Sequence, residues 1–493
     1  MKTLFYCTII TVITMAAAPA IASDNSMSLK QIVTIVLNNH PDLQVSRIDT
    51  AIAKTGRERI QGMLDPSISA SIIASEEKTP VSSDFQAAET RTGQVTGGIN
   101  KPLPNGDTVS ANFTYSRISQ AYNSPLAAQL SRFNPAYRNQ INISYRHPLL
   151  KGAGRPDYYQ SLAVTDADIE AADMQRQQRA HQIILQVVNA CFQLASDDIN
   201  IRIAAQAVKR AKKLLAYQRS RERFGLIEKA DRLQAEALLA ARNTDLQRAL
   251  SMRMNSQTSL NRMMLRSGET ELAVHLQTSE PASAPSMDDA LNQAESKRPE
   301  MQLLTAQLQA AEARLAISRD ADQMQLDLIA EAGSRALARD GATAAARGFT
   351  VKDHYAALSF ELSDVLTRNS ANADIRKAEL QRERVAAERI RTHEQIKSDI
   401  SAAITAIHAG RPMLVVARKQ AVAEKRKFDA EMQRYREGRS DTATLVQFEG
   451  ELRNAELNAN LQALTLELAA RQLSWAIGTL RDELGLTDIS AGQ

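Results

Sequence analysis

The chain contains two copies of one unit, and this duplication limits the folds open to it more than any other feature. Residues 28–43 (SLKQIVTIVLNNHPDL) align with residues 286–301 (SMDDALNQAESKRPEM) at an offset of 258 residues. Further along, Ile141 aligns with Leu358 at a smaller offset of 217. Most of the difference arises between residues 64 and 139. The sequence therefore predicts a duplicated architecture whose first copy carries one inserted segment.

The first residues have the layout of an exported protein. Lys2 precedes an apolar run over residues 4–15, and Ala20-Ile21-Ala22 ends it, so residues 1–22 are predicted to be a cleaved signal peptide. Cys191 is then the remaining cysteine, and no internal disulfide is expected. After the signal we find no run of the ~20 apolar residues that a membrane helix needs. Acidic and basic residues are mixed and the formal net charge is +4, which gives no case for a nucleic-acid partner.

Each copy is expected to open with two helices separated by a proline. Ile32, Val33 and Val36 repeat at helical spacing before Pro41, and the second copy repeats the pattern before Pro299. Proline disfavours the helical conformation of the residue before it and starts a new helix well. We therefore predict a helix, a break and a second helix, extending to about residue 64 in the first copy.

The periodicity then changes to two. Apolar and polar side chains alternate over residues 67–72, 109–115 and 141–145, and in the second copy over parts of 323–335 and 354–364. Such alternation predicts strands with one apolar and one polar face. A soluble sheet packed on a core would show the same pattern.

Two observations favour a membrane barrel over a soluble sheet. Aromatic residues concentrate around these segments, as in the interfacial girdles of barrels. Asn105-Gly106 predicts a tight hairpin turn, whereas residues 76–92 and 118–138 are long and polar connections. Short turns on one side and long loops on the other are typical of outer-membrane barrels. The insertion, residues 93–117, would add a hairpin to this set of strands.

The rest of each copy, after the strands, is predicted to form a long helical hairpin. Residues 157–267 contain no proline and a single glycine, Gly225, where the chain is expected to turn. The second copy repeats this with a turn at Gly438. Leucine and alanine recur at spacings of three and four, which predicts coiled-coil packing. Pro412 is expected to kink or interrupt its helix.

No arrangement of residues points to catalysis. The seven histidines are scattered, and we find neither a nucleophile elbow nor a phosphate loop. The sequence therefore predicts that the protein is not an enzyme and has no cofactor and no metal.

Several motifs resemble one known family. His40-Pro41-Asp42-Leu43 and Arg298-Pro299-Glu300-Met301 look like its entry into each copy, and residues 147–154 (HPLLKGAG) resemble the segment that follows its second strand. Residues 435–449 resemble its tip turn and returning helix, and residues 475–480 (WAIGTL) its closing segment. In order and spacing, the chain beyond the signal resembles the TolC-like outer-membrane efflux proteins.

This resemblance implies an α+β membrane protein built from a duplicated helix–strand–strand–helical-hairpin unit. It implies a homotrimer in the cell outer membrane, whose shared β-barrel continues into a long periplasmic α-helical, coiled-coil tunnel. Such a channel is the passive exit duct of a tripartite efflux pump or type I secretion system. Its implied partners are outer-membrane lipid, a periplasmic adaptor (membrane fusion) protein and an inner-membrane pump. The alternative is a periplasmic or surface coiled-coil adaptor or adhesin that forms no channel.

The expected boundaries follow from these elements. They are 1–22 signal peptide; 23–268 first repeat, with helices 28–64, strands about 65–148 including the inserted hairpin 93–117, and a helical hairpin about 157–266; 269–286 linker; 287–481 second repeat, with strands about 323–335 and 354–364 and a helical hairpin about 370–478; and 482–493 C-terminal tail. The trimer would have 18 strands if the inserted hairpin joins the barrel and the family's twelve if it does not.

The candidate functional site is a gate at the helical tips, marked by Gly225 and Gly438, where a trimer would present charges as rings. In proteins similar to TolC, paired acids follow the second tip glycine, but here Thr444 and Gln447 occupy those positions. The acids near the tips are Asp231, Asp441 and Glu449. Asp231 is the preferred ring residue, and a helix-start carboxylate is the simpler interpretation of Asp441 and Glu449.

Overall fold

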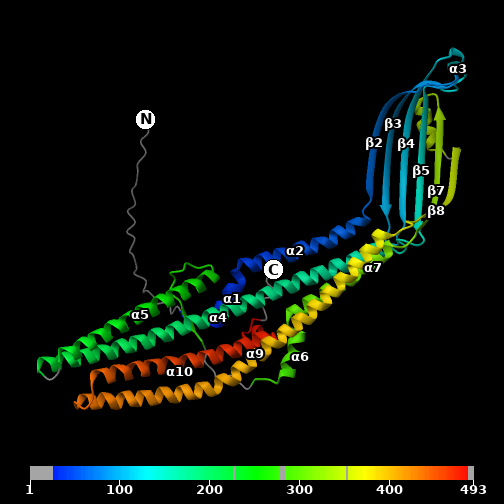
Figure 1. Ribbon diagram of the computed structural model, residues 1–493. Coiled ribbons are helices and arrows are strands. Elements are labelled where there is room, and N and C mark those ends of the chain that lie inside the picture. The colour runs from blue at the N-terminus through cyan, green and yellow to red at the C-terminus, as the bar shows by residue number, and fades with distance from the viewer. Residues whose placement is uncertain (1–25, 226–227, 277–283, 351–352, 487–493) are drawn as a thin grey trace, which may run out of the picture.

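The molecule is elongated, with a β-sheet at one end and a body of long helices at the other (Figure 1). The computed structural model describes residues 26–225, 228–276, 284–350 and 353–486. The predicted signal peptide lies outside these residues. The first copy contributes β1 (Ser26–Ser28), α1 (Leu29–Asn39), α2 (Pro41–Gln61), η1 (Gly62–Leu64), β2 (Ser67–Lys78), β3 (Ala87–Pro102), β4 (Thr108–Tyr122), α3 (Pro125–Leu130), β5 (Ala136–Pro148), α4 (Pro156–Arg223) and α5 (Lys229–Met263).

The second copy repeats this order without a counterpart of β3 and β4. It contributes, after β6 (Ala273–His275), α6 (Met287–Lys297), α7 (Pro299–Ala321), β7 (Gln325–Ala338), α8 (Gly341–Gly348), β8 (His354–Ser363), α9 (Asn369–Arg436), α10 (Thr442–Ile477) and α11 (Leu480–Glu483). The two copies therefore differ mainly by the β3–β4 hairpin.

Local chemistry sets the start of each copy. The Ser28 hydroxyl accepts a hydrogen bond from the Gln31 amide, and the Gln31 side chain accepts one from the Ser28 amide. This capping box satisfies amides that the first helical turn leaves free. Pro41 and Pro299 are the first residues of α2 and α7, where the missing proline N–H costs nothing.

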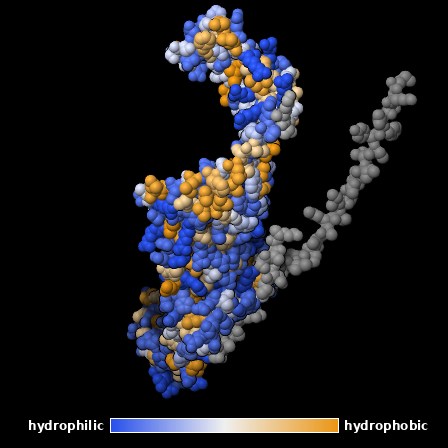
Figure 2. Space-filling model, turned by 90° about the vertical axis from the view of Figure 1, so that its right-hand side faces the viewer, coloured by the Kyte–Doolittle hydropathy of each residue, from blue (hydrophilic) through white to orange (hydrophobic). Residues whose placement is uncertain are grey.

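The six long strands form one antiparallel sheet in the order β2-β3-β4-β5-β7-β8. The inserted hairpin thus lies inside the sheet, between β2 and β5, and its strands extend well beyond the expected 93–117. The short β3–β4 turn lies at the helical end, whereas the β4–β5 and β7–β8 connections at the far end contain α3 and α8 (Figure 1). Figure 2 shows this part of the chain as an open arc above the helices, so one chain does not close a barrel.

The sheet has two chemically distinct faces, and the inserted hairpin shares both. Ile99, Ala111 and Ile143 stand opposite one another on β3, β4 and β5, and the row continues through Ala332 to Ala356. We call this the apolar face; it includes Ile72, which is 82% exposed. The adjacent row turns to the other, polar face. Its members are Asn100, Ser110, Ser144, Glu331 and Ala357.

The helical body consists of two long antiparallel hairpins, α4 with α5 and α9 with α10, that lie side by side (Figure 1). Near the sheet, α2 and α7 pack against α4. Buried side chains form three clusters along the body, the one nearest the tips including Leu214, Leu238, Phe428 and Leu445. Alanine is frequent on the buried faces, which allows the helices to pack closely.

The structure refines three expectations from the sequence. The predicted linker 269–286 contains β6, which pairs in parallel with β1 in a two-stranded sheet. Pro412 does not interrupt its helix: α9 continues through it, although the helix changes direction along its length (Figure 1). The buried residues of α10 include Leu445, Leu452 and Ala455 and, further along the helix, Leu464.

One helix passes a test for membrane spans. Among the helices in the described residues, α9 contains a stretch long and apolar enough to cross a membrane by length and composition, and 28% of that stretch is buried. A single helix of this kind is weak evidence, because the core helix of a soluble protein passes the same test.

Candidate gate at the helical tips

Both helical hairpins turn at a glycine in the left-handed region. Gly225 follows α4 with φ +68°, and Gly438 follows α9 with φ +74°. A side chain at either position would strain the backbone, which is why glycine ends these helices. Near the tips α10 packs against both α4 and α5. The structure therefore brings the starts of the two returning helices together.

A buried polar network joins the two tips. The Gln218 amide of α4 donates to the Tyr435 hydroxyl and, at 2.8 Å, to the Thr442 hydroxyl. Thr442 in turn donates to Asp231 Oδ1 at 2.8 Å. Gln218 and Thr442 are 0% and 1% exposed. Burial, together with the charge of Asp231, raises the pKa of Tyr435. We call Gln218, Asp231, Tyr435 and Thr442 the tip network.

Asp441 caps a helix. Its carboxylate accepts hydrogen bonds from the Thr444 amide at 2.7 Å and the Thr444 hydroxyl at 3.0 Å. These bonds lower the pKa of Asp441. This is the arrangement expected of a residue at the start of α10. Gln447, one turn further, is exposed.

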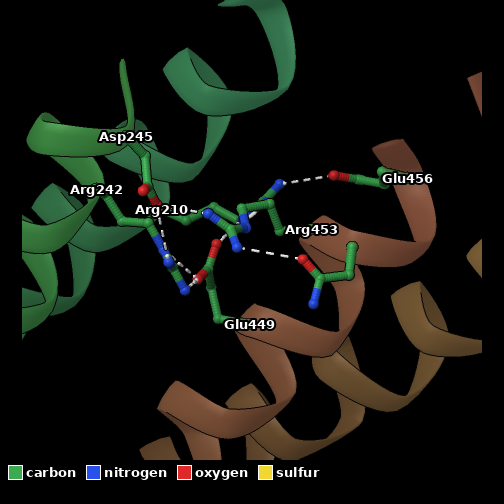
Figure 3. A network of polar contacts seen from close by, with 7 residues as sticks. Arg210, Arg242, Asp245, Glu449, Arg453 and Glu456 are labelled. Carbon is green, nitrogen blue, oxygen red and sulfur yellow. Dashed lines mark hydrogen bonds and ion pairs between the residues drawn. The ribbon is translucent and has the colours of Figure 1, made fainter. Parts of the chain in front are cut away.

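Glu449 lies buried between the two hairpins (Figure 3). It is 2% exposed, and its carboxylate contacts Arg210 of α4 at 3.1 Å and Arg242 of α5 at 2.7 Å. Three helices therefore meet at one carboxylate. This pairing occupies both carboxylate oxygens, so Glu449 offers no free charge to solvent within a single chain.

Further charges complete this arrangement. Arg242 also contacts Asp245 at 3.3 Å, and Arg453 of α10 contacts the Asp245 carboxylate at 2.5 Å. Arg210 reaches Glu456 at 3.2 Å. Three arginines thus face three acids, and the group has no net formal charge. We call these six residues the Glu449 cluster (Figure 3).

The structure separates the three acids that the sequence nominated for a gate. Asp231 belongs to the tip network, Asp441 caps α10, and Glu449 lies in its own cluster. Sequence reasoning missed the arginines and Gln218. A signal was present for Gln218, because Ala211, Leu214 and Gln218 share one face of α4 at coiled-coil spacing, and a polar residue there stands out.

The predicted turn at Asn105-Gly106 packs against another turn. Gly106 has φ +98°, and an added Cβ would lie 2.6 Å from the Gly152 carbonyl oxygen. Beside it, Asp107 is 2% exposed and accepts a hydrogen bond from the Tyr145 hydroxyl at 2.5 Å. The turn is therefore fixed to the segment that leads into α4. Across the described residues, no group of three or more His, Cys, Asp or Glu could hold a metal ion.

Comparisons with known proteins give matches in three-dimensional structure. No family model matches the sequence, and no curated protein matches it. Among solved structures, the outer-membrane channel OprN is 17% identical, with a TM-score of 0.66 over 92% of this chain and 90% of that chain. The outer-membrane protein VceC from Vibrio cholerae is 14% identical, with a TM-score of 0.66 over 91% of this chain and 96% of that chain. The open state of the Neisseria gonorrhoeae MtrE outer-membrane channel is 17% identical, with a TM-score of 0.63 over 92% and 89%.

These matches extend over nearly the whole of each chain. The architecture is therefore that of the outer-membrane channel proteins. More particularly, this chain has the TolC-like fold, as the motifs of the sequence predicted. At these identities the likeness concerns the fold.

Proposed function

We propose that this protein is a non-enzymatic outer-membrane channel, the passive exit duct of a tripartite efflux pump or type I secretion system. The observation that carries the proposal is the sheet: six strands with one apolar and one polar face, joined at one end to long helical hairpins. An apolar outer face and a polar inner face suit a barrel in lipid around an aqueous lumen. A coiled-coil adaptor or adhesin has no need of such a sheet.

The open edges of the sheet support a homotrimer. β2 and β8 are 12 and 10 residues long, and each leaves one edge without a partner strand within the described chain. Unpaired backbone groups are costly in lipid, so the edges need closure. β2 and β8 run in opposite directions, so β8 of one copy can pair antiparallel with β2 of the next.

Three copies of a six-stranded sheet give 18 strands. At ordinary strand spacing and tilt this corresponds to a barrel about 35 Å across between backbones, wide enough for an aqueous channel. The shared faces of β3 and β4 favour 18 strands over the twelve implied by the family resemblance. The helical body would lie in the periplasm, where the tips would meet an adaptor protein and an inner-membrane pump.

The central test combines conductance with mass. Purified, detergent-extracted protein is expected to be a trimer by mass and to give discrete single-channel currents in planar bilayers. A monomer or dimer that never conducts would refute the channel and favour the coiled-coil adaptor or adhesin.

Neighbouring cysteines on β3 test the 18-strand barrel. Cysteine at Val95, on the apolar face, is expected to react only with a membrane-soluble maleimide, whereas cysteine at Thr96, on the polar face, should react with a water-soluble one. The native Cys191 gives little background because it is 0% exposed and burial raises its pKa to about 12. Labelling of both positions by the water-soluble reagent would exclude the hairpin from the membrane.

Asp231 remains our candidate for the gate. Asp231→Ala removes one charge per copy and the hydrogen bond from Thr442, so we expect higher single-channel conductance or a weaker cation preference. Thr442→Val serves as the matched variant, because it removes the hydrogen bond and keeps the charge. A change in ion preference in Asp231→Ala alone would assign the effect to charge. Unchanged conductance and ion preference in both variants would remove Asp231 from the gate.

A further inference from the structure

Helix α8 packs against β5 and β7, at the end of the sheet away from the helical body (Figure 1). It covers the apolar face, because Asn139, which alternates with Ile141 and Ile143 on that face, is 0% exposed and donates to the Ala345 carbonyl of α8 at 3.2 Å. A Cβ at Gly341 would lie 2.2 Å from the Tyr115 hydroxyl, so glycine permits the close approach. If the apolar face meets lipid, α8 lies outside the barrel wall, where the strands leave the membrane.

Aromatic side chains surround α8. Phe349 directly follows the helix and stacks on Phe113, with ring centroids 6.4 Å apart and planes at 19°. Tyr115 and Tyr137 form a second pair at 6.4 Å. Phe349 keeps 72% of its surface exposed. Aromatic rings with one apolar and one wet side are typical of the membrane–water interface.

Three exposed arginines lie at this end of the sheet and on α8. Arg117 projects from the same face and donates through Nε to the Tyr137 hydroxyl at 3.2 Å. Arg339 directly follows β7, which ends at Ala338, and Arg347 lies near the end of α8. Within the described part of the chain, none of the three forms an ion pair with a carboxylate. The acid beside them, Asp340, is engaged in capping α8.

The neighbouring end of β2 and β3 provides a contrast. There Lys78 and Arg91 are each paired with both Glu76 and Glu89. Unpaired positive charge is therefore not a general property of this end of the sheet. Arg117 of β4 pairs with Tyr137 of β5, and Tyr137 pairs with Ala338 of β7. Arg117 therefore lies two strands away from Ala338, the residue before Arg339.

We propose that this surface binds the phosphate groups of an anionic outer-leaflet lipid. The surface, which we call the α8 rim, comprises Arg117, Arg347, Phe113, Tyr115, Tyr137 and Phe349. Guanidinium groups bind phosphate in a bidentate manner, and the rings lie at the depth of the sugar and upper acyl region. This proposal rests on the outer-membrane location proposed above. It adds a lipid partner that the resemblance to channel proteins does not specify.

The test uses the detergent-purified full-length protein. Native mass spectrometry measures the binding of a glycolipid that carries two phosphates on its sugar headgroup, and of the same lipid after phosphatase treatment. Arg117→Gln with Arg347→Gln is expected to weaken binding of the phosphorylated lipid about tenfold, since charge-assisted hydrogen bonds are lost. Arg335→Gln is the matched control, because Arg335 lies on β7 but faces the polar side, with its guanidinium 4.1 Å from the Tyr355 ring centroid.

The outcomes separate this proposal from the channel function. Equal binding by the double variant and the wild type, or equal binding of the dephosphorylated lipid, would overturn the α8 rim as a phosphate site. The double variant should keep the single-channel conductance of the wild type, because its substitutions lie outside the lumen. Phosphate-dependent lipid binding by a protein that never conducts would support the rim and refute the channel.

Discussion

Glu449→Gln is expected to lower the free energy of unfolding by about 3–5 kcal/mol, the usual cost of removing one partner from a buried ion pair. The substitution conserves volume but leaves Arg210 and Arg242 facing a neutral amide, with Glu449 2% exposed in the parent. Because this carboxylate connects α4, α5 and α10, the loss should also separate the two hairpins. Chemical denaturation of the detergent-solubilised protein, followed by far-ultraviolet circular dichroism, measures the effect.

Glu451→Gln is the control for this prediction. It lies two residues away on α10, and its pairing with Lys427 is partly exposed, so its loss should cost no more than about 1 kcal/mol. A second variant replaces Arg210, Arg242 and Glu449 together by methionine. These are three of the six residues of the Glu449 cluster, and Asp245 keeps its contact with Arg453 at 2.5 Å. Replacing a buried ion triad by apolar residues is often neutral. Equal stability of Glu449→Gln and Glu451→Gln would contradict the role assigned to the Glu449 cluster.

The architecture could be predicted from the sequence because each element leaves a local pattern in it. Proline breaks marked the entry to each copy, alternation marked the strands, and Gly225 and Gly438 marked the tips. These signals depend on a few neighbouring residues and on backbone preference. Because the unit is duplicated, most of these patterns occur twice in the chain. The long-range fold could therefore be anticipated from short-range patterns.

The partners of the tip acids could not be anticipated in the same way. Glu449 and Arg242 are 207 residues apart, and no local pattern links a carboxylate on one hairpin to a guanidinium on the other. The same holds for Thr442 and Asp231. The pairing of β1 with β6 was not predicted either, because each strand has only three residues. Sequence spacing located the tips, but the contacts depend on how the two hairpins pack.

The junction between the two copies contains a histidine that the fold keeps neutral. His181 of α4 is 7% exposed and stacks on Trp475 of α10, with centroids 5.0 Å apart and planes at 13°. Arg298 covers the Trp475 ring at 4.6 Å and pairs with Glu300 at 3.0 Å. Both ring nitrogens of His181 are buried without a hydrogen-bond partner in the described structure. Protonation would place an unsolvated charge near Arg298.

We expect the protein to lose stability as the pH falls below about 6.5, because of this histidine. Burial, followed by the charge of Arg298, lowers the pKa of His181 to about 3 from its ordinary value of 6.5. The unfolded chain therefore binds this proton first, and the contribution to stability is complete above pH 6.5 and lost progressively down to pH 3. By pH 5, before most carboxylates titrate, the loss should reach roughly 2 kcal/mol. Denaturant midpoints measured between pH 7.5 and 5 test this.

His181→Phe separates this effect from other acid effects. Phenylalanine keeps a ring against Trp475 but cannot bind a proton, so the variant should lose little stability between pH 7.5 and 5 even if it is less stable overall. His408→Phe, at an exposed position on α9, should keep the pH dependence of the parent, since water solvates that ring in both states. A parent protein whose stability does not change over this range would show that His181 is accessible to water. The junction between the two copies would then be open in solution, and the ring stack could not hold α4 against α10 there.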